Sequence, residues 1–125
     1  FRDDVDSYRA KAEAVRNVET YRGCYAIGVC PSKGLDSPTV VAAQAANELL
    51  DINSVKASFV LTEYNNTIYI SARAIDEVNV QIIMERMGGG GHINIAGTQL
   101  ADKTVTVAIV QLKETSDQMI KEGAI

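Results

Sequence analysis

The four glycines Gly88–Gly91 and the histidine after them, His92, are the residues of this sequence that folding alone explains least. Glycine loses more backbone freedom on folding than any other residue, so a packed domain keeps such a run only for unusual dihedrals or close backbone approach. Bare N–H groups can approach a phosphate closely, and an imidazole beside them can donate a hydrogen bond. The pattern favours an anion site made by Gly89, Gly90, Gly91 and His92, although a flexible joint between helices is the alternative.

A second group with possible chemistry lies in the segment 67–72, where apolar and polar residues alternate as in a strand. The alternation places Ser71 and Arg73 on one face, about 7 Å apart along the strand. A hydroxyl and a guanidinium on an open face can hold an anion. The alternative is an ordinary solvated face of the sheet, because most exposed arginines have no chemical role. The strand ends shortly before the helix that leads into the glycine run, so the fold can bring Arg73 and His92 to the opening of one binding site.

Other reactive groups are few. Cys24 and Cys30 flank a predicted strand, and their separation along an extended chain is too large for a disulfide, so we interpret both as buried thiols. The sequence has 1 histidine and no clustered cysteines, which leaves no transition-metal site that we can assemble. We therefore expect neither a metal site nor catalytic residues in this chain.

Bulk composition limits the class of protein. The 125 residues are 46% hydrophobic, which suits one domain with a hydrophobic core. The net charge of -4 argues against wrapping long duplex nucleic acid, because that requires a basic face, but it leaves a small charged ligand possible. The chain has neither a long apolar run nor the apolar core of a signal peptide, so we expect a soluble segment.

The first half of the chain predicts two helices and one strand. A helix over 2–18 has an apolar stripe, and it either covers the domain's own sheet or connects to a neighbouring domain. A strand over 25–29 follows, and then a helix over 38–50, which we expect Ser37 to cap and Pro38 to begin. The stripe of the first helix consists of Val5, Tyr8, Ala12 and Val15.

The second half predicts the elements that carry the candidate site. Strands over 57–62 and 67–72 form a hairpin through 63–66, and a helix follows, capped at its start by Asn79 and at its end by Gly88. We predict a short helix over 92–99, whose first turn would offer unpaired N–H groups to an anion, and a short extended segment over 98–100. The segment 104–112 fits either a strand or a longer helix, and we choose the helix.

This order of elements predicts an α/β fold, a mixed β-sheet with helices packed on it. With these residues in view, the chain from about Tyr25 to its end resembles the C-terminal, DHH-associated domain of the Asp-His-His (DHH) phosphoesterases. The segments that carry the resemblance are Gly89-Gly90-Gly91-His92 with Ala96-Gly97, Ile70-Ser71-Ala72-Arg73 and Val78-Asn79-Val80. They look most like those of membrane-anchored cyclic-di-AMP phosphodiesterases. On this basis we expect a connector helix over 1–22 and one DHH-associated domain over 23–125.

The resemblance also implies a division of labour. In that family the preceding DHH domain binds two manganese ions and activates water, while the DHH-associated domain grips the nucleotide through its glycine–histidine motif. It implies that Gly89, Gly90, Gly91 and His92 hold a phosphate of a cyclic or short linear dinucleotide. Ser71 and Arg73 would assist. Two departures from the family pattern are the fourth glycine, Gly88, and the bulk of Ile95 beside the motif.

The chain alone is then expected to bind without cleaving, as a cytoplasmic domain of a membrane-anchored bacterial protein that itself makes no direct membrane contact. Its expected partner is the upstream DHH domain, and a homodimer with a second copy of the chain stays open. Three other functions stay open. They are an oligoribonucleotide-binding domain of a related exonuclease, a nucleic-acid-binding appendage like that of alanyl-tRNA synthetases, and a non-catalytic dimerisation module.

Overall fold

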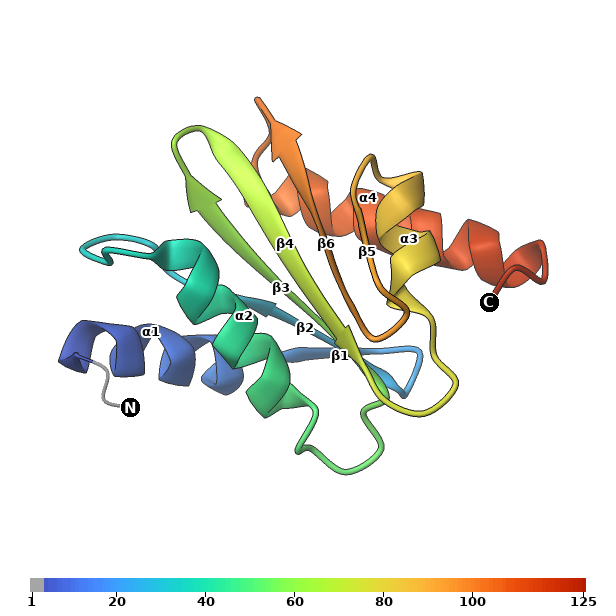
Figure 1. Cartoon of the computed structure of the whole chain (residues 1–125), viewed down its shortest axis with the longest axis horizontal. Coiled ribbons are helices and arrows are strands. Elements are labelled where there is room, and N and C mark those ends of the chain that lie inside the picture. The colour runs from blue at the N-terminus through green and yellow to red at the C-terminus, as the bar shows by residue number, and fades with distance from the viewer. Residues whose placement is uncertain (1–3) are drawn as a thin grey trace.

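A six-stranded sheet with the strand order β1-β2-β3-β4-β6-β5 forms the centre of the computed structural model, which describes residues 4–125 (Figure 1). All neighbouring strands are antiparallel except β2 and β3, which run parallel. The strands are β1 (Glu19–Tyr21), β2 (Tyr25–Val29), β3 (Ala57–Tyr64), β4 (Thr67–Ala74), β5 (Gly90–Gly91) and β6 (Ile95–Ala101). The predicted α/β fold with a mixed sheet is confirmed.

Four helices cover the two faces of this sheet. They are α1 (Val5–Arg16), α2 (Pro38–Leu49), α3 (Val80–Arg86) and α4 (Val105–Lys121). The helices α1 and α2 pack on one face, and α3 and α4 pack on the other (Figure 1). Within residues 4–125, no helix is long and apolar enough to cross a bilayer.

The two faces bury residues of different size. Under α3 and α4 the core contains large side chains such as Phe59, Leu61 and Met84, none more than 1% exposed. Under α1 and α2 the core consists largely of alanines, among them Ala42 and Ala45. Small residues let a helix approach a sheet closely, so α2 sits tightly over β3 and β4. On the same face, β6 exposes Ile95 and Gln99 beyond α2.

The first helix forms as predicted, but the predicted buried stripe is wrong. Val5 and Tyr8 are each 61% exposed, whereas Ala10 and Ala14 are buried. The reason is close packing, since a Cβ on Gly28 of β2 would already lie 3.2 Å from the carbonyl oxygen of Ala14. The predicted helix also included residues 2 and 3, which lie outside the described residues. The four predicted stripe residues Val5, Tyr8, Ala12 and Val15 are all exposed.

The predicted short helix over 92–99 is wrong, and this correction changes the candidate site. Residues Ile95–Ala101 form β6, which pairs with β4 and places Ala96, Thr98 and Leu100 in the interior. Burial on alternate residues fits a strand and not a helix, and pairing with β4 satisfies the backbone of the segment. The predicted extended segment over 98–100 is confirmed as part of β6.

The remaining helix and hairpin predictions are largely confirmed. The hairpin of β3 and β4 turns at Asn65 and Asn66, whose φ values of 53° and 59° are those of a tight two-residue turn. Segment 104–112 is confirmed as helix from Val105 onward, and the Thr104 side chain caps it by accepting a hydrogen bond from the N–H of Val107. The predicted side-chain cap of α2 is wrong, because Ser37 makes no capping hydrogen bond.

The two cysteines are free thiols, as predicted, but the predicted burial is confirmed only for Cys30. Cys30 is 1% exposed at the end of β2, and Cys24 is half-buried. Burial raises the pKa of the Cys30 thiol to about 11, because the thiolate would lose its hydration. Cys30 therefore stays protonated at neutral pH and acts as a packing residue.

Candidate functional site

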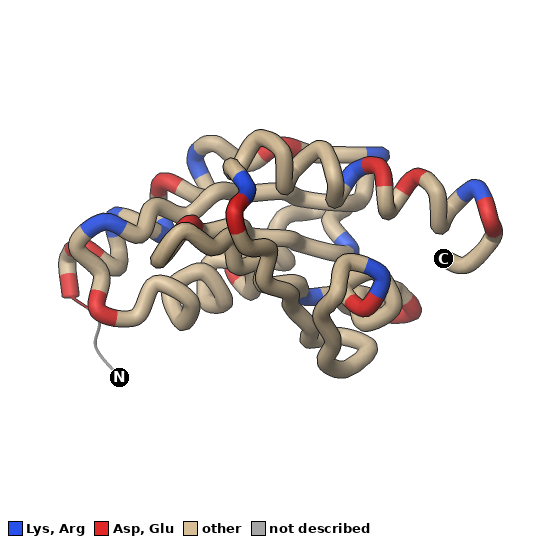
Figure 2. The backbone as a smooth tube through the Cα atoms, turned by 90° about the horizontal axis from the view of Figure 1, so that it is seen from above, with Lys and Arg blue, Asp and Glu red and all other residues tan. Residues whose placement is uncertain are grey.

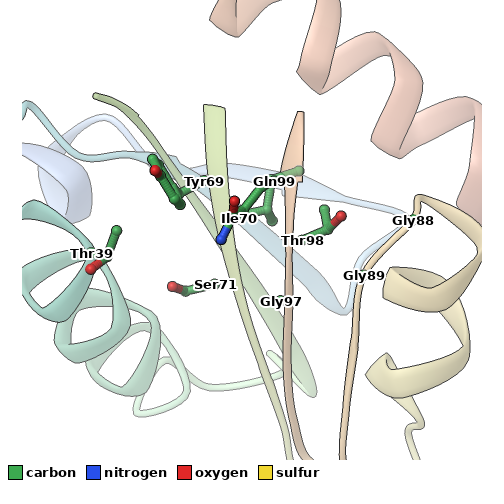
Figure 3. A pocket seen from close by; sticks show the side chains of 9 residues that line it. All are labelled: Thr39, Tyr69, Ile70, Ser71, Gly88, Gly89, Gly97, Thr98 and Gln99. Carbon is green, nitrogen blue, oxygen red and sulfur yellow. The ribbon is translucent and has the colours of Figure 1, made fainter. Parts of the chain in front are cut away.

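The strands β4, β6 and β5 leave one face partly uncovered beyond α2, and this surface is called the open face. Its residues are Tyr69, Ser71, Arg73, Gly90, Ile95, Gly97 and Gln99. A cleft of about 470 Å³ lies over it, between the start of α2 and the turn after α3 (Figure 3). The cleft is lined by Thr39, Tyr69, Ile70, Ser71, Gly88, Gly89, Gly97, Thr98 and Gln99.

Strand register arranges the open face in three rows. Across the strands, Tyr69 lies opposite Gln99, Ser71 opposite Gly97 and then Gly90, and Arg73 opposite Ile95. The middle row carries only one side chain, the hydroxymethyl group of Ser71, because its other two members are glycines. The centre of the open face is therefore a strip of bare backbone beside a hydroxyl group.

Packing explains three of the four consecutive glycines. Gly88 has φ +89° and ends α3, its N–H donating to the carbonyl oxygen of Glu85. A Cβ on Gly89 would lie 2.1 Å from the carbonyl oxygen of Gly97, which no side chain tolerates. Gly91 combines φ +142° with a Cβ position 2.5 Å from the carbonyl oxygen of Ile95. These three positions need glycine in order to fold.

Gly90 is the exception. Its φ is not positive, and a Cβ placed there would meet no atom within 4 Å. Because Gly90 lies opposite Gly97, that Cβ would stand on the open face. Folding does not explain this glycine, whereas a ligand that approaches the backbone closely would.

His92 lies in the turn between β5 and β6. Its backbone N–H donates to the carbonyl oxygen of Ile95 at 2.7 Å, and the residue is exposed. It is not part of a helical first turn, so the predicted anion site at a helix start is replaced by a strand hairpin. Ile95 lies between His92 and Arg73 in register, which puts the backbones of these two residues two strand spacings, about 10 Å, apart.

Arg73 supplies positive charge at the same end of the open face. It is half-buried, and its Nη1 donates to the carbonyl oxygen of Ala72 at 2.9 Å. No carboxylate among the described residues forms an ion pair with it. Burial lowers the pKa of Arg73, yet an arginine stays charged at neutral pH. The uncompensated cation, partly shielded from water, can attract an anion.

The six predicted site residues are thus distributed along one end of the sheet. Ser71 and Gly89 line the cleft itself. Gly90, Gly91, His92 and Arg73 lie beside it, on β5, its turn and β4. The structure gathers the six around the bare strip but places His92 and Arg73 on opposite sides of Ile95.

Most of the chain matches a known family. Residues 23–122 match the DHHA1 domain. The chain belongs to the DHHA1 domain family. This DHHA1 domain is 39% identical to the cyclic-di-AMP phosphodiesterase PdeA of Listeria monocytogenes over 117 residues, which are 93% of the chain and 18% of that protein. It is also 39% identical to the cyclic-di-AMP phosphodiesterase GdpP of Bacillus subtilis over 124 residues, 98% of the chain and 19% of that protein.

The chain spans about a fifth of the length of these two relatives. Among solved structures, an exopolyphosphatase-related protein from Bacteroides fragilis has a TM-score of 0.80 to the DHHA1 domain at 19% identity, covering 94% of this chain and 36% of its own. The C-Ala domain of alanyl-tRNA synthetase from Aquifex aeolicus has a TM-score of 0.59 at 17% identity, covering 79% and 96%. At such identities the two likenesses show a shared fold. The family resemblance predicted from the glycine–histidine motif is confirmed.

Sequence reasoning missed part of the cleft wall of the DHHA1 domain. Tyr69 shares the alternation of Ser71 and Arg73 and could have been included with them. Gln99 was missed because it was predicted at the end of a short helix and within a short extended segment, and neither prediction placed it on a face of the sheet. Thr39 reaches the cleft from α2 on the far side, and no local pattern indicates that (Figure 3).

Two further observations concern the chemistry available to the DHHA1 domain. Among residues 4–125, no group of three or more His, Cys, Asp or Glu side chains is placed to hold a metal ion. Figure 2 shows Lys and Arg positions interspersed with Asp and Glu positions over this part of the chain. Because basic and acidic residues are interspersed, residues 4–125 present no long basic stripe of the kind that binds duplex nucleic acid.

Proposed function

We propose that this DHHA1 domain is the substrate-binding part of a cyclic-di-AMP phosphodiesterase and holds a phosphate of the dinucleotide on the open face. The observation that carries the proposal is Gly90, a glycine that packing does not require, on the same face of the sheet as the uncompensated charge of Arg73. The identity of 39% to two cyclic-di-AMP phosphodiesterases over nearly the whole chain supports the choice of ligand.

The contacts follow from the chemistry of a phosphodiester. Its oxygens carry negative charge and accept hydrogen bonds, which a guanidinium supplies with favourable geometry. Gly90 allows the phosphate to approach the backbone, and the Ser71 hydroxyl can donate to it from the same row. His92, exposed in the turn, can donate from the edge of the site.

In this proposal, hydrolysis belongs to a DHH domain elsewhere in a longer protein, where manganese ions would activate the water. The chain itself contributes binding and orientation of the substrate. We propose that it works on the cytoplasmic side, with any membrane anchor outside this segment. The isolated chain should therefore bind the dinucleotide and not cleave it.

Calorimetry on the isolated chain tests this proposal. We expect cyclic-di-AMP to bind, and Arg73→Ala to weaken binding by at least about tenfold, because a charge-assisted contact is lost. The matched control is Arg16→Ala, which removes an exposed arginine at the end of α1. Equal affinity of the Arg73→Ala and wild-type chains would refute the proposal.

A second test uses a longer protein that contains both the DHH and the DHHA1 domain. There His92→Ala should abolish cleavage of cyclic-di-AMP while the bound manganese, measured by elemental analysis, stays unchanged. Full activity of this variant would count against the proposed role of the hairpin turn.

A further inference from the structure

We propose that the side-chain amide of Gln99 recognises an adenine base, with that base and its ribose lying in the cleft between α2 and β6. The inference rests on the proposed function and adds the residue that reads the base. The assignment of Gln99 depends on the uncharged lining of the cleft, on the position of the cleft relative to Arg73, and on the unpaired amide of Gln99.

The side chains that line the cleft are uncharged. Beyond the row of Ser71, the side chains of Thr39, Tyr69 and Gln99 supply hydroxyl and amide groups, and none of the cleft-lining residues is acidic or basic. A charged phosphate would find no counter-ion there, whereas a nucleoside is neutral and forms several hydrogen bonds. The lining therefore fits the nucleoside part of the ligand.

The position of the cleft agrees with this assignment. Arg73 lies at one end of the open face, and the row of Tyr69 and Gln99 lies four residues along β4, a distance of about 13 Å at strand rise. A phosphate held near Arg73 and Gly90 would direct its nucleoside toward that row. The cleft volume of about 470 Å³ lies in the usual range for small-molecule sites.

Gln99 is the cleft residue best suited to distinguish bases. It is exposed, and its amide has no hydrogen-bond partner elsewhere in residues 4–125. Tyr69, opposite Gln99 on β4, has its ring centroid 6.5 Å from that of Tyr64 and forms part of the cleft wall beside Gln99. Figure 3 shows Thr39 on α2, on the opposite side of the cleft from Gln99.

The chemistry of a primary amide favours adenine over guanine. The amide NH₂ can donate to N7 of adenine while its carbonyl oxygen accepts from the N6 amino group. Guanine presents two acceptors, N7 and O6, at the same edge, so the carbonyl oxygen of Gln99 would face another acceptor. A well-formed bidentate pair of this kind discriminates between bases by roughly 5-fold to 150-fold.

The experiment measures dissociation constants of cyclic-di-AMP and cyclic-di-GMP for four forms of the chain, the wild type, Gln99→Leu, Gln99→Glu and Arg73→Ala. The wild type should prefer cyclic-di-AMP by about tenfold or more. Gln99→Leu should reduce that preference to near one by weakening cyclic-di-AMP binding. Gln99→Glu keeps the size of the side chain but cannot donate to N7, so it should weaken cyclic-di-AMP binding as well. Arg73→Ala should weaken both ligands equally and leave the preference unchanged.

The outcomes separate this inference from the proposed function. If the wild type binds cyclic-di-AMP but both Gln99 variants keep its preference for adenine, the role of Gln99 is refuted and the phosphate site stands. A wild type that binds both dinucleotides equally would also refute it. If the wild type binds neither dinucleotide, the proposed function fails and this inference fails with it. Melting curves of the Gln99 variants should match the wild type, and Gln118→Leu on the surface of α4 serves as the control for losing an amide.

Discussion

The two faces of strands β4 and β6 have opposite roles, although their residues alternate along the same short segments. On the face under α3 and α4, Ile68 and Ile70 are at most 2% exposed and are packed in the main core. On the open face, the side chains of Ser71 and Gln99 have no hydrogen-bond partner among the residues described. One face is thus packed in the hydrophobic core, and the other is free to contact a ligand. Substitutions on the first should alter stability, and those on the second should alter binding.

The glycine run also contains both kinds of position, those that packing requires and one that packing does not require, within three residues. At Gly89 and Gly91 an added Cβ would overlap the backbone of β6, whereas at Gly90 it would meet open space. The comparison separates glycines that the fold requires from the one glycine that a ligand would require.

The largest effect is expected at Gly89. Gly89→Ala places a Cβ 2.1 Å from the carbonyl oxygen of Gly97, and backbone atoms cannot yield as a flexible side chain can. The free energy of unfolding should fall by about 3 kcal/mol or more, seen as a large loss in melting temperature. A variant that melts with the wild type would show that the β5–β6 contact is looser than described.

A pair of adjacent residues tests the two faces directly. Ile70→Ala leaves a cavity in the core and should cost about 2–5 kcal/mol of unfolding free energy. Ser71→Ala should change stability by no more than about 0.5 kcal/mol. The order should reverse in calorimetry with cyclic-di-AMP, where Ser71→Ala weakens binding because a donor from the middle row is lost. Equal loss of stability in both variants would contradict the division of the faces.

Gly90→Ala should give the converse of Gly89→Ala. Its melting temperature should stay close to that of the wild type, because the added methyl group meets no atom within 4 Å. Binding of cyclic-di-AMP should weaken by about tenfold or more, because the methyl group keeps the phosphate away from the backbone. Unaltered affinity would mean that no ligand approaches Gly90.

The smallest effect is expected far from the open face, where α4 is tied to β1. Tyr21 and Arg22 each donate to the carboxylate of Asp117 at 2.6 Å, and these bonds lower the pKa of Asp117. A carboxyl group whose folded pKa lies below its unfolded value stabilises the fold above the unfolded pKa and loses this contribution as the pH falls. Asp117→Asn should therefore lower the melting temperature slightly at pH 7. The difference from wild type should shrink below the ordinary aspartate pKa of 3.8. Ligand binding at pH 7 should not change.

Local sequence patterns were sufficient for several elements. The hairpin of β3 and β4, the Asn79 cap of α3 and the helix end at Gly88 depend on residues close in sequence, so they could be predicted. The same holds for the face of Ser71 and Arg73, because alternation along a strand is a local property.

The errors arose where partners distant in sequence decide the outcome. Residues 92–99 contain small and apolar residues that suit a helix, but β4 offers an unpaired edge that turns 95–101 into a strand. The buried side of α1 follows the alanines that fit against Gly28 and α2, and the larger Val5 and Tyr8 remain outside.

The family, the mixed α/β fold and the glycine–histidine motif could be predicted from the sequence, because each depends on consecutive or regularly spaced residues. Which glycine is free of packing, and which side chains line the cleft, became clear from the folded chain alone. Steric overlap at Gly89 and Gly91, and the positions of Thr39 and Gln99 around one cleft, depend on distances between strands and helices that no local spacing encodes.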